Sequence, residues 1–462
     1  MRNVVRKKIA ALPNLSRGGK IGNIPELTGS DYWGRVRQAQ KRMGGYTHLL
    51  LYGDREHFSN IEYFTGFDPR FEEALFVIPK EGVPSIIVGN EGNDYANMIC
   101  YELRKIVYPP FSLPGQPGHD VRPLDTILRS AGLTEKSTIG VIGWKLFSRE
   151  DGWDADKSFD LPYFIMENVL KVVPLSSLSN AIELMIGLDS GMRIINDLKE
   201  LLLSEIAGTL TSRNVYRVLQ NLREGMTEIE ASEYLNISGM PLSVHPNVNF
   251  GKNLSYGLAS PTSGARLKRG DVVGIGMAYR RTLCHKVGYF VESAQEEPES
   301  RRAFYDTYFR AVSAWYQALK IGATGEEVYE AVRKETGDLS GFGIGLNPGH
   351  LIHTDEWTNS PFWPGCKSRL ASGMMVQCDF TAAKAGQDLF AHAEDGVLLA
   401  DESTRKEIEK TSPAAWRRIQ ERRDFMIGQL GIMISQEVLP TSDLPGIIFP
   451  YLCDTETAVA FG

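Results

Sequence analysis

The sequence predicts an α+β protein of two domains, in which an α/β domain is followed by a domain of long helices and antiparallel strands. Up to about residue 185, strand-like runs alternate with turns and helix-like stretches, a pattern typical of α/β domains. Beyond Met192 the pattern changes to long amphipathic segments and then to paired strand-like runs. With 462 residues, 42% of them hydrophobic and 23% charged, the chain is long enough for two or three hydrophobic cores.

The strands expected in the first domain are apolar runs separated by turn residues. The run THLLLYGDREHFSNIEYFTGF, which starts at Thr47, predicts a buried strand, a turn and a second short strand. ALFVIPKEGVPSIIVG predicts two more strands around a Pro/Gly turn, and STIGVIGWK near Gly140 predicts another. We expect this first domain to span residues 1–185.

The second half of the chain begins with helices. RIINDLKELLLSEIAGTLTSRNVYRVLQNL predicts a long amphipathic helix, and Thr227 with Glu230 three residues later predicts the capped start of another. Paired strands are expected over 242–291, a helix pair over 299–335 and more strands over 343–400. The charged run TRKEIEKTSPAAWRRIQERRDFMIGQLGI predicts a helix, followed by an extended end. We therefore expect a second domain at 186–405 and a C-terminal helix with an extended tail at 406–462.

Charge and cysteine usage exclude several classes of protein. A net charge of -7 and a pI of about 5.8 provide no general attraction to nucleic acid or to anionic lipid. No apolar run is long enough to span a membrane, and the basic start MRNVVRKKIAAL leads into no apolar signal region. The five cysteines are scattered and form no CxxC motif, so we expect reduced thiols and a cytoplasmic protein.

Six segments resemble, in order and spacing, those of the creatinase, prolidase and methionine aminopeptidase family. They are NIEYFTGFDPRFEEALFVI, REGMTEIEA, LKRGDVVGIG, NPGHLIH, SGMMVQCDF and AEDGVLLAD. The resemblance implies a creatinase/prolidase-like N-terminal domain followed by a pita-bread catalytic domain. It also implies a homodimer and a small-molecule substrate.

The same resemblance implies a degenerate metal site. The family holds two divalent cations with two aspartates, one histidine and two glutamates. Here the first aspartate position is Gly276, and the second is His285, or Val287 if the count has no gap. His350, Asp379 and Glu394 occupy the remaining three positions. About half of the required negative charge is left, so we expect no metal cofactor or, as the alternative, one divalent ion.

The candidate site residues follow from these positions. The catalytic candidates are His350, His285, Asp379 and Glu394, and the substrate-binding candidates are His353, Glu356, Trp357, His392, Arg70 and Phe71. Arg70 and Phe71 enter only by fold analogy, because the N-terminal domain of the family reaches over the partner subunit's pocket. Cys284 and Cys378 are expected to be buried, each on the strand face opposite to its candidate neighbour. The family's further histidine corresponds to Ala259, so the creatinase mechanism does not transfer residue by residue.

The function expected from these residues is hydrolysis of a C–N bond in a small polar metabolite, in the manner of creatinase and without the family's two metal ions. In one alternative the chain is a mononuclear metalloenzyme, a lyase or an Xaa-Pro-peptidase-like enzyme, with His285, His350, Asp379 and Glu394 as ligands. In another it is a non-catalytic binding scaffold. Neither nucleic acid nor a membrane is an expected partner.

Overall fold

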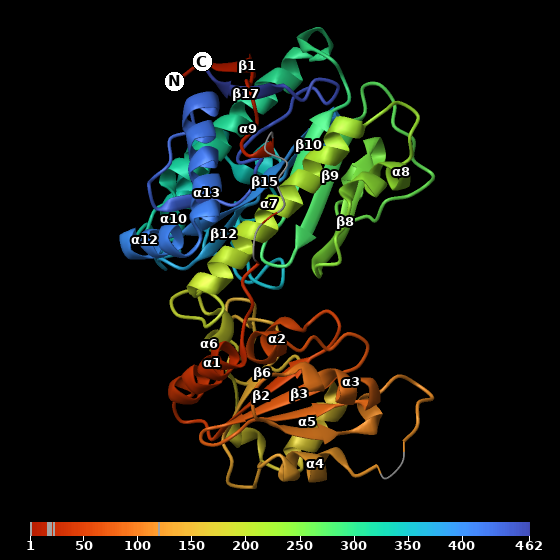
Figure 1. Cartoon of the computed structure of the whole chain (residues 1–462), viewed down its shortest axis with the longest axis vertical. Helices are drawn as coiled ribbons and strands as arrows, with labels where there is room; N and C mark the ends of the chain where they lie inside the picture. Colours follow the sequence, from red (N-terminus) through yellow and green to blue (C-terminus); the bar gives the residue numbers. More distant parts are fainter. Residues whose placement is uncertain (1, 16–20, 22–23, 119–120) are drawn as a thin grey trace. The chain divides into compact units, whose positions relative to one another are not determined.

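The chain folds into two compact units, Glu26–Arg193 and a second unit made of Met1–Pro25 and Ile194–Gly462 (Figure 1). The computed structural model describes residues 2–15, 21, 24–118 and 121–462. The N-terminal strand β1 (Val4–Lys8) pairs in antiparallel fashion with the last strand, β17 (Thr457–Phe461). This pairing explains why the start of the chain groups with the C-terminal unit.

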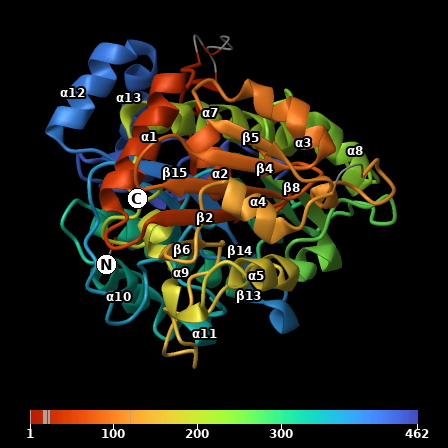
Figure 2. The same cartoon turned by 90° about the horizontal axis from the view of Figure 1, so that it is seen from below.

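The unit Glu26–Arg193 is a three-layer α/β structure. Its six-stranded sheet has the order β5 (Arg104–Val107), β4 (Ser85–Val88), β3 (Ala74–Pro79), β2 (His48–Gly53), β6 (Ile139–Ile142) and β7 (Leu178–Asn180). Strand residues alternate between two cores: Leu49 and Leu51 pack with helices α1 (Gly29–Arg42) and α2 (Ser59–Thr65), while Leu50 and Tyr52 pack with α4 (Leu124–Ser130) and α5 (Tyr163–Leu170). Figure 1 shows α1 and α2 on one side of this sheet and α4 and α5 on the other, and Figure 2 shows its strands β5, β4 and β2 side by side. The apolar runs expected to be strands form its centre.

One expected strand of this unit is a helix. The residues SNIEYFT form α2, whereas the sequence pattern predicted a short strand. Ile61, Phe64 and Thr65 are buried at helical spacing, and Gly66 ends the helix in the left-handed region with φ 71°. A short apolar run fits both the two-residue period of a strand and the 3.6-residue period of a helix. Gly66, which ends the helix, is the residue that favours the helix.

The C-terminal unit is built on an antiparallel sheet. The sheet is seven-stranded, with the path β11 (His350–Leu351), β12 (Met375–Cys378), β15 (Ala393–Leu399), β10 (Cys284–Tyr289), β9 (Val272–Tyr279) and β8 (Leu242–Phe250), and β16 (Val438–Pro440) pairs with β15. Two short strands, β13 (Ala382–Lys384) and β14 (Leu389–Ala391), form a separate hairpin. All described pairings of the larger sheet are antiparallel.

Long helices pack against one face of this sheet. Helix α7 (Leu198–Asn221) reaches Met277 of β9 through Asn214, and α9 (Glu299–Ala318) pairs with α10 (Gly325–Thr336). Asp197 caps α7, so RIIND precedes the helix, and Thr227 with Glu230 forms the predicted capping box of α8 (Glu228–Ser232). A four-residue helix, α11 (Leu339–Phe342), follows α10.

The C-terminal helix is divided, although the sequence pattern predicted one helix. It consists of α12 (Glu402–Thr411) and α13 (Pro413–Phe425), which meet at Ser412. Proline has no N–H to donate and disfavours helical conformation in the residue before it, so Pro413 begins a new helix.

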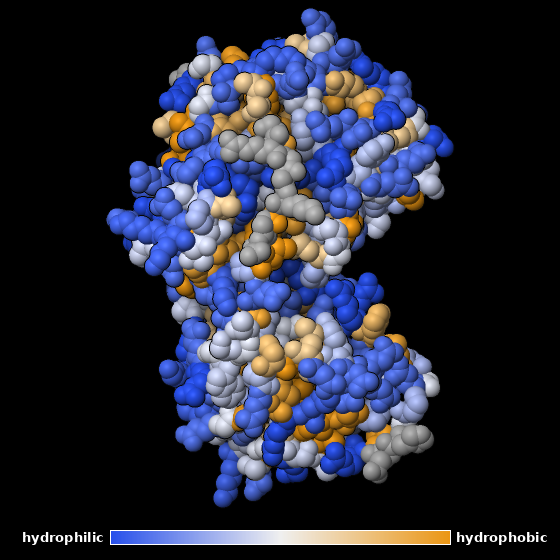
Figure 3. Space-filling model, viewed as in Figure 1, coloured by the Kyte–Doolittle hydropathy of each residue, from blue (hydrophilic) through white to orange (hydrophobic). Residues whose placement is uncertain are grey.

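The surface of each unit is mainly polar. On the face drawn in Figure 3, hydrophilic residues cover most of the surface of each unit, and smaller apolar patches lie among these residues. Among the described residues, no helix is both long enough and apolar enough to cross a membrane.

Candidate functional site

The catalytic candidates His285, Glu394 and His350 lie on one face of the C-terminal sheet. Helix α7 packs on the opposite face. Gly276 of β9, His285 of β10 and Glu394 of β15 stand directly opposite one another on neighbouring strands. Directly opposed residues of antiparallel strands share a face, and alternate residues of one strand do too. Gln377, opposite Gly396, and His350, opposite Gln377, continue this face to the sheet edge. Residues far apart in sequence thus meet without long loops.

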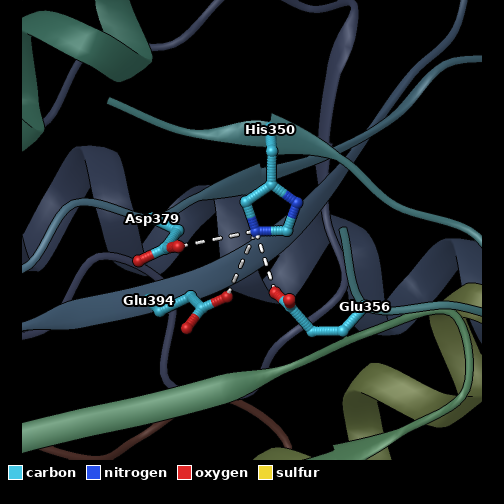
Figure 4. Close-up of side chains that lie close together, drawn as sticks. All are labelled: His350, Glu356, Asp379 and Glu394. Atoms are coloured by element: carbon cyan, nitrogen blue, oxygen red, sulfur yellow. Dashed lines mark ion pairs between the residues drawn. The ribbon is translucent and has the colours of Figure 1, made fainter. Parts of the chain in front are cut away.

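His350 lies at the centre of three carboxylates. Its Nε2 is 3.1 Å from Glu356 Oε1, 3.5 Å from Asp379 Oδ2 and 3.8 Å from Glu394 Oε1, as Figure 4 shows. One ligand atom from each of these four residues lies within 4.8 Å of all the others. The imidazole is fully buried and stacks on Trp357, with ring centroids 4.3 Å apart and an interplanar angle of 17°. The stacking fixes the plane of the ring.

The charges of this cluster shift its pKa values in opposite directions. Burial alone would lower the pKa of His350, but the charge of Glu356 and contacts with the carboxyl groups of Asp379 and Glu394 outweigh burial and raise it well above 6.5. Burial and the charge of Asp379 raise the pKa of Glu394 well above 4.5. Burial would also raise the pKa of Asp379, but the neighbouring imidazoles of His350 and His392 hold it far below its usual range. These shifts favour the ionised form of Asp379 and the protonated form of Glu394.

A second histidine, His392, links Asp379 to His285. His392 Nε2 lies 2.7 Å from Asp379 Oδ1, and its Nδ1 shares a hydrogen bond with Nδ1 of His285. If His392 donates from Nε2 to the carboxylate, its Nδ1 accepts from His285, and the lone pair of His285 is then on Nε2. Burial and the neighbouring His392 hold the pKa of His285 well below 6.5, so its ring is neutral. Asp379, His392 and His285 thus form a chain of hydrogen bonds that ends at the unprotonated Nε2 of His285.

The geometry around Gly276 leaves no room for a side chain at this position. A Cβ at position 276 would lie 2.6 Å from Cδ2 of His285, and a Cβ at Gly274 would lie 3.2 Å from its Nε2. The imidazole of His285 thus fills the space next to β9 that an aspartate at 276 would need. Val287, the other candidate for the second position, is opposite Gly274 instead of Gly276. Neither Gly276 nor His285 supplies a carboxylate to this face of the sheet.

The cluster around His350 does fit one divalent cation. Three carboxylates and one imidazole form a common ligand set for Zn²⁺, Mn²⁺ or Fe²⁺. His350 Nδ1 faces Leu351 O at 3.2 Å, which leaves Nε2 for the cluster, and no hydrogen bond satisfies this buried Nε2. Gln377 donates from Nε2 to Glu394 Oε1 at 3.1 Å and to Leu283 O at 2.8 Å, so it holds the Glu394 carboxylate in place. Such supporting hydrogen bonds are typical of metal ligands.

Two members of this arrangement were not recognised in the sequence. Glu356 was expected to bind substrate, yet it is the carboxylate nearest to Nε2 of His350. The feature that could have indicated this position of Glu356 is its place six residues after His350, in a turn that brings the chain back toward the sheet. Gln377 belongs to no motif in the sequence. It lies in the site only because the strand register places it opposite His350.

The other candidate residues lie outside the cluster. His353 is fully buried, 3.9 Å from Glu200 Oε2. Arg70 and Phe71 belong to the unit Glu26–Arg193, where Arg70 pairs with Asp68 at 3.0 Å and 70% of Phe71 is exposed. Cys284 and Cys378 are buried on the opposite face of the sheet beside Asp395, which pairs with Lys286, and burial raises the pKa of both thiols.

Comparisons with known proteins agree with this description. Residues 203–401 match the model of metallopeptidase family M24. The fold is similar to a prolidase from Thermococcus sibiricus, with 18% identity, 80% of this chain and 95% of that chain covered, and a TM-score of 0.64. It is also similar to an X-Pro aminopeptidase from Thermotoga maritima MSB8, with 15% identity, coverage of 90% and 99%, and a TM-score of 0.62. A comparison with curated protein sequences finds no match.

These similarities confirm the resemblance inferred from the six sequence segments, and with it the pita-bread fold and the class of hydrolases. Residues 203–401 thus match metallopeptidase family M24, and the fold of the chain is similar to those of a prolidase and an X-Pro aminopeptidase.

Proposed function

We propose that the chain is a hydrolase that cleaves a C–N bond of a small polar metabolite at a centre built for a single divalent cation. The observation that carries this proposal is the convergence of His350, Glu356, Asp379 and Glu394, whose ligand atoms lie within 4.8 Å of one another. The steric exclusion of a carboxylate at position 276 by His285 supports one ion over two.

In this proposal those four side chains hold the cation. When bound, a divalent cation polarises the scissile group and lowers the pKa of water. Asp379 fixes the orientation of His392 through the 2.7 Å hydrogen bond, and His392 in turn orients His285. Nε2 of His285 then accepts the proton of the attacking water as general base. Trp357 limits access of bulk water to His350 by covering one face of its ring.

A second candidate is a hydrolase that uses no metal. It is favoured by the opposite pKa shifts of Glu394 and His285, because a protonated carboxyl group and a neutral imidazole form a usable acid–base pair. In this scheme water attacks the carbon of the C–N bond and its proton moves to His285 Nε2. The proton of Glu394 moves to the leaving nitrogen, so the charges balance. Trp357 and Glu356 would then serve as substrate contacts.

Substrate screening with and without metal tests both candidates. Purified protein is offered small amidino, ureido and amide compounds and, in parallel, Xaa-Pro dipeptides, before and after treatment with a chelator. We expect turnover of a small C–N compound that chelation abolishes and one added cation restores, with no cleavage of the dipeptides. His350→Ala should remove this activity, whereas His245→Gln, an exposed histidine outside the cluster, should retain it.

Chelator-resistant turnover that depends on His285 and Glu394 would support the metal-free candidate and contradict the proposal. Cleavage of an Xaa-Pro dipeptide would contradict both candidates. Absence of turnover of any C–N compound, with metal loaded, would count for the non-catalytic alternative.

We also infer that the chain forms a homodimer in which the unit Glu26–Arg193 takes part. Phe71 is 70% exposed and lines a mostly apolar cavity of about 270 Å³ with Phe67, Arg70 and Tyr95. Exposed apolar surface of this kind is typical of interaction sites. Sedimentation should give twice the mass of the chain at micromolar concentration, and a monomer would contradict the inference.

A further inference from the structure

A cavity of about 400 Å³ in the C-terminal unit shares Trp357 with the His350 cluster. It is formed by Tyr329 of α10, by residues 338–340 at the start of α11, and by residues 344–347. None of the residues described above as cation ligands lines it. Its volume suits a group of a few non-hydrogen atoms up to a small ring system.

Trp357 forms the common wall of the cavity and the cluster. One face of its indole is covered by the His350 imidazole at 4.3 Å, and Trp357 also lines the cavity. The side chain is 38% exposed, which is unusual for a large aromatic residue next to a buried ionic cluster. A group stacked on the outer face of the indole would lie about 8 Å from the His350 ring, since stacked rings are separated by about 3.5–4 Å.

The charge of the cavity lining is negative. Among the described residues that line it, Asp338 is the only charged one, and Tyr329 and Trp357 supply aromatic rings. Asp338 Oδ2 accepts hydrogen bonds from Ser340 Oγ at 2.8 Å and from Gly341 N at 2.7 Å. Two accepted bonds do not exhaust a carboxylate, which can accept about four. These hydrogen bonds also lower the pKa of Asp338, so the group is ionised at neutral pH.

We propose that this cavity is a subsite that binds a flat cationic group of the substrate, such as a guanidinium, between the indole of Trp357 and the carboxylate of Asp338. The proposal rests on the proposed function for the reaction at the His350 cluster. An aromatic face attracts a cation, and a planar guanidinium stacks on it while it donates to a carboxylate. The substrate would therefore be a small metabolite whose cationic end lies in the subsite and whose C–N bond lies at the cluster.

Binding of two probes by calorimetry tests the subsite. Phenylguanidine carries the cation, and phenylurea is its neutral counterpart of the same shape. The wild-type protein should prefer phenylguanidine. Asp338→Asn should weaken phenylguanidine binding about two- to fivefold, as expected for a charge pair with an exposed carboxylate, and should leave phenylurea binding unchanged. Asparagine caps a helix as well as aspartate does, so α11 should be retained.

Two further variants complete the test. Leu346→Trp should weaken binding of both probes about tenfold or more, because it fills the cavity from a position that is 67% exposed and so tolerates substitution. Asp401→Asn, which changes the capping aspartate of α12 in the same way, should bind both probes as the wild type does.

A preference for phenylguanidine that survives Asp338→Asn would place the cation among Glu356, Asp379 and Glu394 and would overturn the subsite. Unchanged binding in Leu346→Trp would overturn it as well. If no C–N compound is hydrolysed but the Asp338-dependent preference is observed, the subsite stands and the proposed reaction fails. If hydrolysis is found and neither variant changes probe binding, only the subsite fails.

Discussion

The imidazole of His285 lies directly against Gly276, on the neighbouring strand and in register with it. A Cβ at 276 would come within 2.6 Å of the ring, closer than any relaxed contact between carbon atoms. The two residues are therefore a matched pair, in which glycine at one position is required by histidine at the other. The absence of a side chain at position 276 and the imidazole at position 285 are parts of one arrangement.

Gly276→Ala should lower the free energy of unfolding by about 1–3 kcal/mol, because the added methyl group overpacks the contact with His285. In a His285→Ala background the same change should cost much less, and urea unfolding of the two single variants and the double variant measures this coupling. Gly34→Ala, in helix α1, is the control. Its Cβ meets nothing within 4 Å, so stability should stay equal or rise by up to about 1 kcal/mol. Equal costs of Gly276→Ala in both backgrounds would refute the pairing.

Lys286 and Asp395 form an ion pair on the back of the strands that carry His285 and Glu394. Both side chains are buried, so Lys286→Met should cost about 3–5 kcal/mol by leaving an uncompensated carboxylate. The double variant Lys286→Met/Asp395→Leu should recover a large part of that loss. The exposed pair Lys406–Glu402 is the comparison, and Lys406→Met should cost about 0.5 kcal/mol or less. Additive losses in the buried pair would contradict this account.

Gln377 supports the cluster by donating to Glu394 and to Leu283 O. Gln377→Leu should weaken the affinity for a divalent cation about 10- to 100-fold, because Glu394 loses the group that orients it. Calorimetric titration of chelator-treated protein with Mn²⁺ or Zn²⁺ measures the effect. Gln40→Leu removes an amide that also donates to two carbonyl oxygens, but far from the cluster. It should lower stability without a change in cation affinity, and equal affinities in all three proteins would argue against a supporting role for Gln377.

Acid stability should depend on the Asp54–His57 pair of the N-terminal unit. Burial would raise the pKa of Asp54, but its hydrogen bonds with His57 lower it from 3.8 to about 2. A carboxylate with a lowered pKa stabilises the fold above its unfolded pKa, and this stabilisation is lost as the pH falls toward about 2. Since the pair is partly exposed, we expect a loss of no more than about 1 kcal/mol between about pH 5 and pH 2. Urea unfolding of the wild type and of Asp54→Asn should converge over this range, and a constant difference would contradict the assignment.

The sequence indicates much of the fold because apolar runs and capping residues are local signals. It does so for the long helix capped by Asp197, for the capping box of Thr227 and for the central strands. It fails at α2, where a short apolar run fits two periods, and at Pro413, where a break interrupts an otherwise helical pattern. The first failure concerns the type of an element and the second concerns the end of one, and in both cases a single residue, Gly66 or Pro413, carries the signal.

The candidate site is only partly visible in the sequence, because its geometry depends on strand register. His350, Asp379 and Glu394 could be aligned by motif, whereas the choice between His285 and Val287 depends on a count of two residues in a hairpin. In the structure His285 pairs with Gly276 and Glu394, and this register shows that His285, and not Val287, meets His392. Glu356 could not be placed, since it lies on a turn after a two-residue strand, and tertiary packing alone folds it back onto His350.

The metal content of the protein tests the central claim most directly. Protein purified without chelators, and protein reloaded with Mn²⁺, Zn²⁺ or Fe²⁺ after chelation, is analysed by plasma mass spectrometry against accurately measured protein concentration. We predict one tightly bound divalent ion per chain, lost in His350→Ala and retained in His245→Gln, because the four ligand atoms within 4.8 Å form one site. Two ions per chain, confirmed by two adjacent anomalous peaks beside Glu394, would contradict the account.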